Sequence, residues 1–482
     1  MTAPGPGARP TAPVPAKAPA RPEAPDRPEA RGRRGSTGRT WVPGRADRTA
    51  AVVAVVLVAA AAVTAVVLAR LGHPVRAGAA PLFADWWPHL GPGTPAALLV
   101  AAAVVRFGPP LARRLSWGRL LAAGYATAVG WTLALALVDG WRAGVADRLT
   151  TQHEYLHEVP GVTDIPAMLR GFSARILDFQ PDSWTTHVSG HPPGALLVFV
   201  WLDRLGLSGG GWAGLLCILV GAGTAVAVPQ TVRLLGTDEA ARAVVPFAVL
   251  FPGAVWIGVS ADGLFAGVTA AGVALVTAGA VRRSVLAALA GGVLLGFACY
   301  LSYGLVLMAP VVAAAVLLGG ARRVFWAVLG AAAVAVAFTA AGFSWWTGYH
   351  LVVERYYQGI ASHRAYAYWV WADLAALAVS AGPAAAVVLR RAGSEGGRLR
   401  PRSLAGLRRI SVVWLLPLAA AGSVLAADLS GYSKAEVERI WLPFAVWFAA
   451  GAALIPAGHR RFWLVAQAGT ALLVNHLLFT TW

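Results

Sequence analysis

Residues 50–70 read AAVVAVVLVAAAAVTAVVLAR, an apolar run in which Thr64 is the only polar residue before Arg70. A helix rises about 1.5 Å per residue, so roughly 20 apolar residues cross the hydrocarbon core of a bilayer. Runs of this kind recur along nearly the whole chain, which is 57% hydrophobic. Inside lipid every backbone N–H and C=O needs a partner within the protein, and a helix supplies it. The sequence therefore predicts an all-α fold, a polytopic bundle of transmembrane helices.

The apolar runs predict roughly thirteen membrane spans. They cover residues 50–70, 95–111, 118–138, 211–232, 241–259, 263–281, 284–300, 303–320, 324–344, 366–390, 410–428, 441–457 and 461–480. The segment 194–206 is apolar but too short to span, so we expect it at the membrane interface. With a cytoplasmic N-terminus, the basic runs between these helices all fall on the cytoplasmic side, as the positive-inside rule requires. This pattern predicts a multi-pass protein of the cell membrane.

The chain divides into a basic tail and a long membrane domain. Residues 1–48 are rich in Pro, Ala and Arg and bury too little apolar surface to offset the entropy of ordering, so they are predicted to be a disordered cytoplasmic tail. Residues 49–482 are the predicted membrane domain. Short basic runs beside the helices explain the net charge of +18, and no nucleic-acid partner is expected. Cys217 and Cys299 both fall in predicted helices, so no disulfide framework is expected.

The long polar interval at residues 139–193 is predicted to be a loop on the outer side of the membrane. It gathers titratable side chains in a chain with only 13% charged residues. These are His153, Glu154, His157, Glu158, Asp164, Asp178, Asp182 and His187. Such a concentration indicates an active-site loop. Asp139, where the preceding helix ends, is a candidate general base, because partial desolvation there suits a carboxylate to accept a proton. The alternative is a helix-end carboxylate that only reaches water.

Two short motifs accompany this loop. His191 opens the sequence His-Pro-Pro-Gly, in which two prolines fix the backbone as the chain enters the next apolar segment. A plain helix start is the alternative interpretation. Asp262 lies in the short outer turn Ser260-Ala261-Asp262-Gly263, where it can reach the same outer cavity as Asp139. For Asp262 the alternative is capping of the helix that follows.

Two later outer segments carry cations and aromatic rings. Residues 345–365 include Trp345, Arg355 and Tyr357, and such residues suit a sugar face and a phosphate. An interfacial aromatic belt is the alternative for the rings. Lys434 and Arg439 also fall on the outer side, against the positive-inside trend, which makes them candidate ligands of a lipid phosphate.

His153 and His157 complete the pattern His-Glu-x-x-His, which on a helix binds zinc with two imidazoles and uses the Glu as base. Pro160 ends any such helix soon after His157, and no third-ligand motif follows. A membrane metalloprotease is therefore ranked third, below the two functions described next. A structural or non-catalytic site for a divalent metal is a further alternative.

Taken in order, these pieces resemble the GT-C superfamily of polyprenyl-phosphate-sugar glycosyltransferases, the group of protein O-mannosyltransferases and lipid A aminoarabinose transferases. The resemblance covers roughly residues 120–482. It rests on Val138-Asp139, the long outer loop, His191-Pro192-Pro193-Gly194, Asp203-Arg204-Leu205-Gly206, Arg233-Leu234-Leu235-Gly236, Ser260-Ala261-Asp262 and Glu438-Arg439-Ile440-Trp441-Leu442-Pro443.

The resemblance implies an inverting transfer of a sugar from a polyprenyl-phosphate donor to an acceptor outside the cytoplasm, which is a protein, a lipid or a cell-wall glycan. Asp139 would deprotonate the acceptor hydroxyl, with Asp262 as a second catalytic candidate, while Arg439 and Lys434, with Arg355 in reserve, would receive the departing phosphate. Four further candidates would contact the substrate, namely His187, His191, Trp345 and Tyr357. Membrane lipids are expected partners, and no cofactor is firmly implied.

A transporter or flippase is the main alternative from another functional class. Ion-coupled transporters tend to carry charges near the middle of the membrane and to consist of two related halves. Here the titratable residues gather at one predicted interface, and the sequence shows no internal repeat. The sequence therefore favours a transferase over a transporter.

Overall fold

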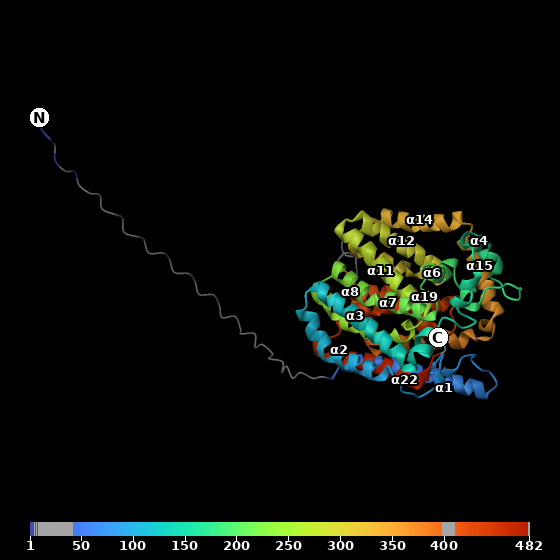
Figure 1. Cartoon of the computed structure of the whole chain (residues 1–482). Helices are drawn as coiled ribbons and strands as arrows, with labels where there is room; N and C mark the ends of the chain where they lie inside the picture. The colour runs from blue at the N-terminus through green and yellow to red at the C-terminus, as the bar shows by residue number, and fades with distance from the viewer. Residues whose placement is uncertain (4, 6, 8–41, 398–409, 481–482) are drawn as a thin grey trace. The chain divides into compact units, whose positions relative to one another are not determined.

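The computed structural model describes residues 1–3, 5, 7, 42–397 and 410–480 (Figure 1). The chain divides into two units, Met1–Arg39 and Thr40–Trp482, and the second contains the helical bundle. The predicted tail therefore lies mostly outside the described residues, as does part of the basic run before residue 410. Where the predicted tail is described, the chain is already helical from Arg45 onward.

Six described helices are long and apolar enough to cross a membrane. They are α1 (Arg45–Arg70), α2 (Thr94–Arg114), α3 (Trp117–Ala136, extended by a 3-10 turn to Asp139), α7 and α8 together (Gly210–Leu235), α11 (Ala261–Arg282) and α19 (Val412–Ser430). Two bent pairs raise the number to eight: α14 (Val324–Ala340) with α15 (Trp345–Gln358), and α16 (Tyr366–Ala381) with α17 (Pro383–Gly396). Shorter apolar helices are α12 (Val285–Leu301), Tyr303–Gly319 including α13 (Ala309–Gly319), and Leu442–Leu454 including α21 (Leu442–Ala445).

Smaller elements complete the described chain. The helices are α4 (Ile165–Gly171), α5 (Thr186–Ser189), α6 (Pro193–Arg204), α9 (Asp238–Val249), α10 (Ala254–Ile257), α20 (Val437–Ile440) and α22 (Arg460–Leu477). The strands are β1 (Ala79–Ala80), β2 (Asp85–Trp86) and β3 (Leu478–Phe479), and β2 pairs antiparallel with β3. The predicted all-α fold with membrane-length helices is confirmed; six to eight described helices reach span length, so the predicted number of about thirteen spans is not confirmed.

Breaks in the helices explain much of this difference. The predicted helix 366–390 bends by 109° between α16 and α17, where Gly382 has a φ of 78° and Pro383 has no N–H to donate. The predicted helix 241–259 is likewise interrupted at Pro252-Gly253, between α9 and α10. In the opposite direction, the predicted loop 345–365 contains the helix α15. Periodicity alone does not locate such breaks, because the apolar composition continues through them.

The interior of the bundle is built around α11, which packs against α7, α8, α12 and α13. In Figure 1, α11, α12 and α14 lie side by side. Gly292 makes the contact between α12 and α14 possible, because a Cβ there would lie 1.9 Å from the carbonyl oxygen of Ala327. Small residues allow such close approach of helices in lipid, where the hydrophobic effect does not drive their association. At the periphery, α1 exposes most of its apolar surface.

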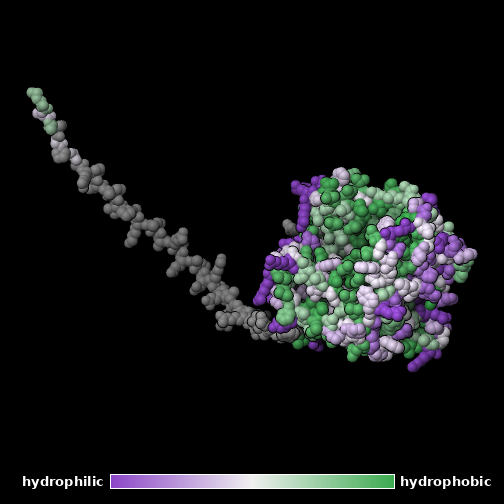
Figure 2. Space-filling view, in the orientation of Figure 1, coloured by the Kyte–Doolittle hydropathy of each residue, from purple (hydrophilic) through white to green (hydrophobic). Residues whose placement is uncertain are grey.

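Polar and charged side chains make contacts at both ends of the bundle. At one end, Arg242 of α9 donates to the carbonyl oxygens of Ala112 and Leu115, and Arg461 donates to that of Arg106. At the other end of α2 and α3, β2 pairs with β3, and Asp139 contacts His89. The sequence places the first group in the cytoplasm and the second outside. Apolar residues cover the middle of the face in Figure 2, with hydrophilic residues at its left edge and right side, as expected for a membrane protein.

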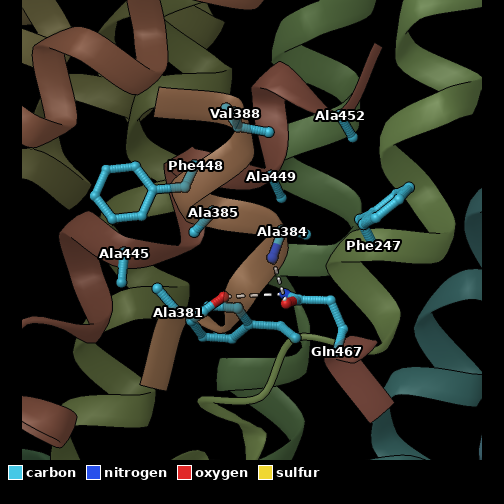
Figure 3. A pocket seen from close by; sticks show the side chains of 11 residues that line it. Phe247, Ala381, Ala384, Ala385, Val388, Ala445, Phe448, Ala449, Ala452 and Gln467 are labelled. Carbon is cyan, nitrogen blue, oxygen red and sulfur yellow. Dashed lines mark hydrogen bonds between the residues drawn. The ribbon is translucent and has the colours of Figure 1, made fainter. Parts of the chain in front are cut away.

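The side chain of Gln467 in α22 forms hydrogen bonds with backbone groups on both sides of the bend between α16 and α17 (Figure 3). Its Oε1 accepts a hydrogen bond from the backbone N–H of Ala384 at 3.1 Å, and its Nε2 donates to the carbonyl oxygen of Ala381 at 2.9 Å. The cavity beside it, lined by Phe247 and Phe448, measures about 20 Å³, which is room for about one water. A broken helix inside the membrane is tolerated where protein groups satisfy its backbone, and Gln467 does so here.

Replacing Gln467 with Leu should lower the free energy of unfolding by about 2–4 kcal/mol, because each buried backbone group left without a partner costs roughly 1–3 kcal/mol. Chemical unfolding of the detergent-purified chain measures this change. Gln180→Leu is the matched control, since Gln180 is exposed and its substitution should leave stability unchanged. Equal stability of the two variants would show that Gln467 does not hold the bend.

Candidate functional site

A set of ionisable residues is buried together at the end of the bundle that the sequence places outside. We call it the Arg439 cluster; its members are Glu154, His187, Asp262, Arg364, Lys434, Glu436 and Arg439. Except for Glu436, which is partly buried, their relative exposures lie between 4% and 8%. Removing a charge from water costs several kcal/mol per ion unless partners compensate. The cluster therefore needs close pairing, and the contacts supply it.

Arg439 is the hub of the cluster. Its Nη1 donates to Oδ2 of Asp262 at 2.6 Å, and its Nη2 donates to Oε2 of Glu436 at 2.8 Å. The same Nη2 lies 3.2 Å from Nε2 of His187, whose Nδ1 lies 2.7 Å from Oε1 of Glu154. This pattern fits an imidazole that donates from Nδ1 to Glu154 and accepts at Nε2 from Arg439. One guanidinium thus ties together the long outer loop, α11 and the segment before α20.

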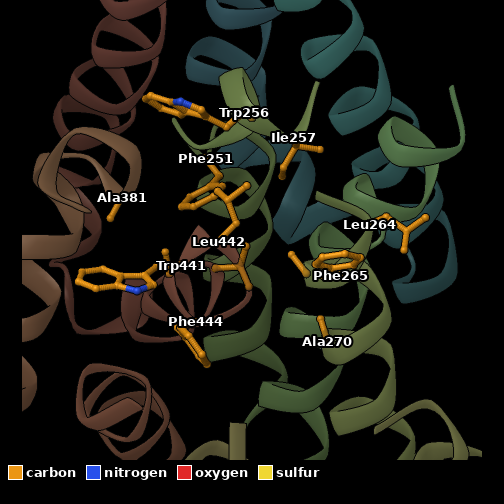
Figure 4. Packing of buried hydrophobic residues seen from close by; sticks show 14 of the residues in the cluster. Phe251, Trp256, Ile257, Leu264, Phe265, Ala270, Ala381, Trp441, Leu442 and Phe444 are labelled. Carbon is orange, nitrogen blue, oxygen red and sulfur yellow. The ribbon is translucent and has the colours of Figure 1, made fainter. Parts of the chain in front are cut away.

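Local packing explains why Arg439 meets Asp262. Trp441 and Leu442, two and three residues after Arg439, are almost fully buried and lie near α10 and α11 (Figure 4). The N-cap of α11 is Ser260, whose Oγ accepts from the backbone N–H of Gly263 at 3.3 Å. The alternative in which Asp262 caps this helix is therefore wrong, and the Asp262 carboxylate pairs with Arg439.

A second branch of the cluster runs through Arg364 to Lys434. Nη2 of Arg364 lies 3.1 Å from Oε1 of Glu436, and its Nη1 donates to the carbonyl oxygen of Lys434 at 2.8 Å. Nζ of Lys434 donates to the carbonyl oxygens of Ala361 and Arg364 at 2.7 Å and 3.0 Å. It also lies 5.5 Å from the ring centre of Tyr357, within range of a cation–π contact. Two of the three N–H donors of this ammonium are thus occupied by carbonyl oxygens.

Electrostatic pairing keeps the central groups charged. Burial alone would lower the pKa of Arg439, but Asp262, Glu436 and Glu154 outweigh it and hold that pKa above its usual value. Burial would likewise raise the pKa of Glu436, yet the neighbouring guanidiniums of Arg439 and Arg364 keep it below its usual value. Burial and Arg364 together lower the pKa of Lys434. The cluster thus combines firmly held ion pairs with one ammonium whose charge is less favoured.

The backbone is strained where the cluster is densest. Ala435 and Glu436 are consecutive non-glycine residues in the left-handed region, with φ of 68° and 62°. Each such residue costs on the order of 1–3 kcal/mol and persists only where its surroundings compensate. The N–H of Ala435 donates to Oδ1 of Asp373 at 3.0 Å, and the Glu436 carboxylate holds two guanidiniums. These contacts maintain a conformation that the local sequence would not choose.

Asp139 has its own pair of partners. Its Oδ1 lies 2.8 Å from Nε2 of His89, and its Oδ2 accepts from Nη2 of Arg148 at 2.8 Å. Arg148 also donates to the carbonyl oxygen of Thr480 at 2.6 Å. The Asp139 side chain is 16% exposed, so it is held in place while still reaching solvent. By contrast, Asp262 is 6% exposed as a side chain. Of the two carboxylates that the sequence singled out, Asp139 is the more accessible to solvent.

Two short segments join Asp139 to the Arg439 cluster. In the first, His89 contacts Asp139, and the N–H of Phe83 donates to Oε1 of Glu438, next to Arg439, at 3.2 Å. In the second, Arg148 pairs with Asp139, and Glu154 pairs with His187 of the cluster. Residues 83–89 and 148–154 each reach roughly 20 Å when fully extended. Asp139 and Arg439 therefore lie at the same end of the bundle.

The remaining predicted residues support this region from its edge. Nδ1 of His191 lies 2.9 Å from the Tyr155 hydroxyl, and the motif that follows starts α6 at Pro193, as predicted. Gly194 is required there, because a Cβ would lie 2.5 Å from the carbonyl oxygen of Tyr300. Arg355 pairs with Asp178 of the long loop and lies outside the Arg439 cluster.

The two predicted aromatic residues differ in their surroundings. Trp345 donates from Nε1 to the carbonyl oxygen of Cys299 at 2.8 Å and stacks on Tyr349, with ring centres 5.6 Å apart. Tyr357 is 47% exposed and faces Lys434. Trp345 is thus tied to the neighbouring helix, whereas Tyr357 remains accessible to a ligand.

The His-Glu-x-x-His pattern does not form the helix that a zinc protease needs. Glu154 is extended, with φ of −102° and ψ of 165°, and only Tyr155–His157 form a 3-10 turn. The Glu154 carboxylate turns inward to His187, while His153 and His157 are exposed. Within the described ranges, no group of three or more His, Cys, Asp or Glu side chains is arranged to hold a metal. The protease alternative therefore loses its structural basis.

Several residues of this region were not singled out as site residues from the sequence. These are His89, Arg148, Arg364 and Glu436; Glu154 was named only within the titratable loop and the His-Glu-x-x-His pattern. Arg148 and Arg364 could have been identified by the criterion that identified Lys434 and Arg439. All four are cationic residues on the predicted outer side, against the positive-inside trend. The pairing of Glu154 with His187 crosses a loop without periodic structure, so spacing gives no indication of it.

Glu438 should make the stability of the chain depend on pH. Burial raises its pKa to about 7. In the unfolded chain a Glu titrates near 4.3, so between these values only the folded state retains the proton. The proton bound at Glu438 in the folded state stabilises the fold by an amount on the order of 3 kcal/mol. This stabilisation is fully present below about pH 4.3 and is lost as pH rises through about 7. Unfolding of wild type and Glu438→Gln between pH 5 and 8 should show a steeper decline in stability for wild type than for the variant. Parallel pH curves would contradict this expectation.

Comparison with known proteins adds no assignment to this geometry. Neither the family models nor the curated proteins that were searched gave a match to the chain.

Proposed function

We propose that the chain is a membrane glycosyltransferase that moves a sugar from a polyprenyl-phosphate donor to an acceptor at the outer face of the membrane, within a GT-C-like bundle of about thirteen helices. The observation that carries the proposal is the Arg439 cluster at the same end of the bundle as the accessible carboxylate of Asp139. Ionisable residues at membrane depth are expensive and are a functional-site hypothesis by default. Such a cluster suits a phosphorylated lipid better than it suits an apolar ligand.

In this proposal Asp139 is the general base. An acceptor hydroxyl gives its proton to the Asp139 carboxylate while its oxygen bonds to the anomeric carbon of the donor. The bond between that carbon and the phosphate oxygen breaks, and the polyprenyl phosphate leaves with the electron pair. Arg148 and His89 orient the carboxylate for this step from opposite oxygens. A base of this kind contributes typically 10²–10⁴-fold to the rate.

We assign the phosphate contact first to Lys434. Arg439 is already bound to Asp262 and Glu436, which neutralise it, so its proposed role is to position the site. Lys434 has carbonyl oxygens and an aromatic ring around its ammonium and no carboxylate within ion-pair distance among the described residues. Arg355 stays the reserve candidate. Tyr357, exposed beside Lys434, is suited to stack on the sugar.

The bend at Gly382 weighs against the transporter alternative. Transporters use broken helices to bind substrates or ions with the freed backbone groups. Here the side chain of Gln467 occupies groups on both sides of the break, the carbonyl oxygen of Ala381 and the N–H of Ala384. This arrangement supports a structural bend rather than a transport site.

An in vitro assay separates the two classes of function. The purified chain is reconstituted in liposomes with a short-chain polyprenyl-phosphate sugar labelled in the sugar, and extracts of cell-envelope protein, lipid and glycan serve as acceptors. A transferase moves label into one acceptor class and releases polyprenyl phosphate in equal amount. Translocation of the intact donor without release of polyprenyl phosphate would establish the flippase alternative instead.

A further inference from the structure

A large cavity lies between α1 and the bent pair α16–α17, at the end of the bundle away from Asp139. It measures about 690 Å³, within the usual range for ligand sites. Its walls are almost entirely apolar and rich in small side chains, among them Ala50, Ala54, Ala378 and Ala385, with Leu57 near one end and Arg390 at the other. The stretch of α1 from Ala46 to Leu57 runs along it for roughly 16 Å. This is a narrow apolar groove with one cationic end.

The cationic end is built around Asp47. This residue is 1% exposed and lies between two guanidiniums: Oδ1 accepts from Nη2 of Arg390 at 2.5 Å, and Oδ2 accepts from Nη2 of Arg391 at 2.6 Å. One carboxylate cannot neutralise both arginines, and Arg45 and Arg48 flank it on the first turn of α1. Four arginines against one aspartate leave a local charge of 4 − 1 = +3. The mouth of the groove therefore attracts an anion.

Arg390 connects the two features directly. It lines the apolar groove and also belongs to the charged end. Its Nε is buried and has no hydrogen-bond partner in the part of the chain that the structure describes, and its side chain is still 33% exposed. A buried donor without a partner costs free energy, and a phosphate at the mouth would bring acceptor oxygens to this arginine.

We propose that this groove, which we call the α1–α17 groove, binds an anionic phospholipid of the surrounding bilayer. One acyl chain would lie along the small residues of α1, α16 and α17, and the phosphate would contact Arg390 and Arg391. The lipid would bridge α1, which is mostly exposed, to the rest of the bundle. The charge at the mouth selects an anionic headgroup over a zwitterionic one. This site is independent of the proposed transferase site at the opposite end.

Native mass spectrometry of the full chain in detergent tests the proposal. After delipidation, phosphatidylglycerol and phosphatidylcholine with identical acyl chains are titrated separately. We expect the first phosphatidylglycerol to bind at least fivefold more tightly, since each arginine near a phosphate contributes roughly that factor. Arg390→Gln should remove the preference, and Ala50→Leu should weaken both lipids by filling the groove. Arg282→Gln, an exposed arginine at the end of α11, is the matched control and should keep the preference.

Three outcomes would overturn the proposal. Equal binding of the two lipids by wild type would remove the role of charge. Retention of the preference in Arg390→Gln, or its loss in Arg282→Gln, would place the anionic lipid elsewhere. Displacement of phosphatidylglycerol by equimolar polyprenyl phosphate, sensitive to Arg390→Gln, would make the groove a donor site. If Ala50→Leu fails to fold, the comparison of Arg390→Gln with Arg282→Gln still decides.

Discussion

The Arg439→Met variant is expected to unfold with about 3–5 kcal/mol less free energy than wild type, because removing one partner of a buried ion pair leaves an uncompensated charge. In this chain two carboxylates, those of Asp262 and Glu436, lose their shared guanidinium at once. The fraction of Arg439→Met that folds should have lost sugar transfer. Without Arg439, the segment carrying Lys434 loses its contact with His187 of the long loop. Chemical unfolding in detergent and the liposome transfer assay measure the two effects.

A matched control separates stability from function. Arg242 also makes an ion pair and two backbone contacts, but at the other end of the bundle. Arg242→Met should lower stability while the folded fraction keeps its full transfer rate. Arg439→Lys is expected to recover part of the stability and little activity, because an ammonium cannot reproduce the forked contacts to two carboxylates. A stable and active Arg439→Met variant would remove the cluster from the mechanism.

The Asp139→Asn variant is expected to lose about 10³-fold in turnover while binding the donor with unchanged affinity. An amide keeps the shape of the carboxylate and can still accept from Arg148, so the fold should be retained. It cannot take a proton from the acceptor hydroxyl, and general bases contribute typically 10²–10⁴-fold. Turnover at saturating donor and a separate binding titration distinguish the catalytic effect from a binding effect.

Asp147→Asn is the control for this experiment. Asp147 lies on the same loop, but its side chain is 54% exposed and its contact with Arg142 is 3.7 Å long. Its removal should change neither turnover nor stability by a measurable amount, as is usual for exposed ion pairs. Wild-type turnover in Asp139→Asn, or an equal loss in Asp147→Asn, would exclude the role proposed for Asp139.

Much of the fold could be predicted because long runs of apolar residues identify membrane helices. Every predicted apolar run corresponds to helical structure in the described chain; α3 and α11 agree closely in their limits, whereas α1 begins five residues earlier, within the predicted tail. The misses occur where a helix bends, as at Gly382, or where a polar segment is helical, as in α15. A bend stabilised by Gln467 depends on a residue more than 80 positions away, and local sequence carries no information about such a partner.

The candidate site could be predicted as a set of residue types more readily than as a set of contacts. Position and charge singled out Asp139, Asp262, Lys434 and Arg439, and all four lie at one end of the bundle. Sequence reasoning assigned Arg439 to a phosphate, whereas the structure pairs it with Asp262 and Glu436. Whether a cationic side chain is available to bind a phosphate depends on which carboxylates the tertiary structure places beside it, and the local sequence does not specify these.

The central claim is that the end of the bundle containing Asp139 and the Arg439 cluster binds a phosphorylated lipid carrying a sugar. A cryo-EM structure of the chain with a non-transferable polyprenyl-phosphonate sugar tests it most directly. The phosphonate should lie within hydrogen-bonding distance of the Lys434 ammonium, with the anomeric carbon facing the Asp139 carboxylate. Phosphonate density at the opposite end of the bundle, beside Arg390, or at neither end under saturating analogue, would contradict the account.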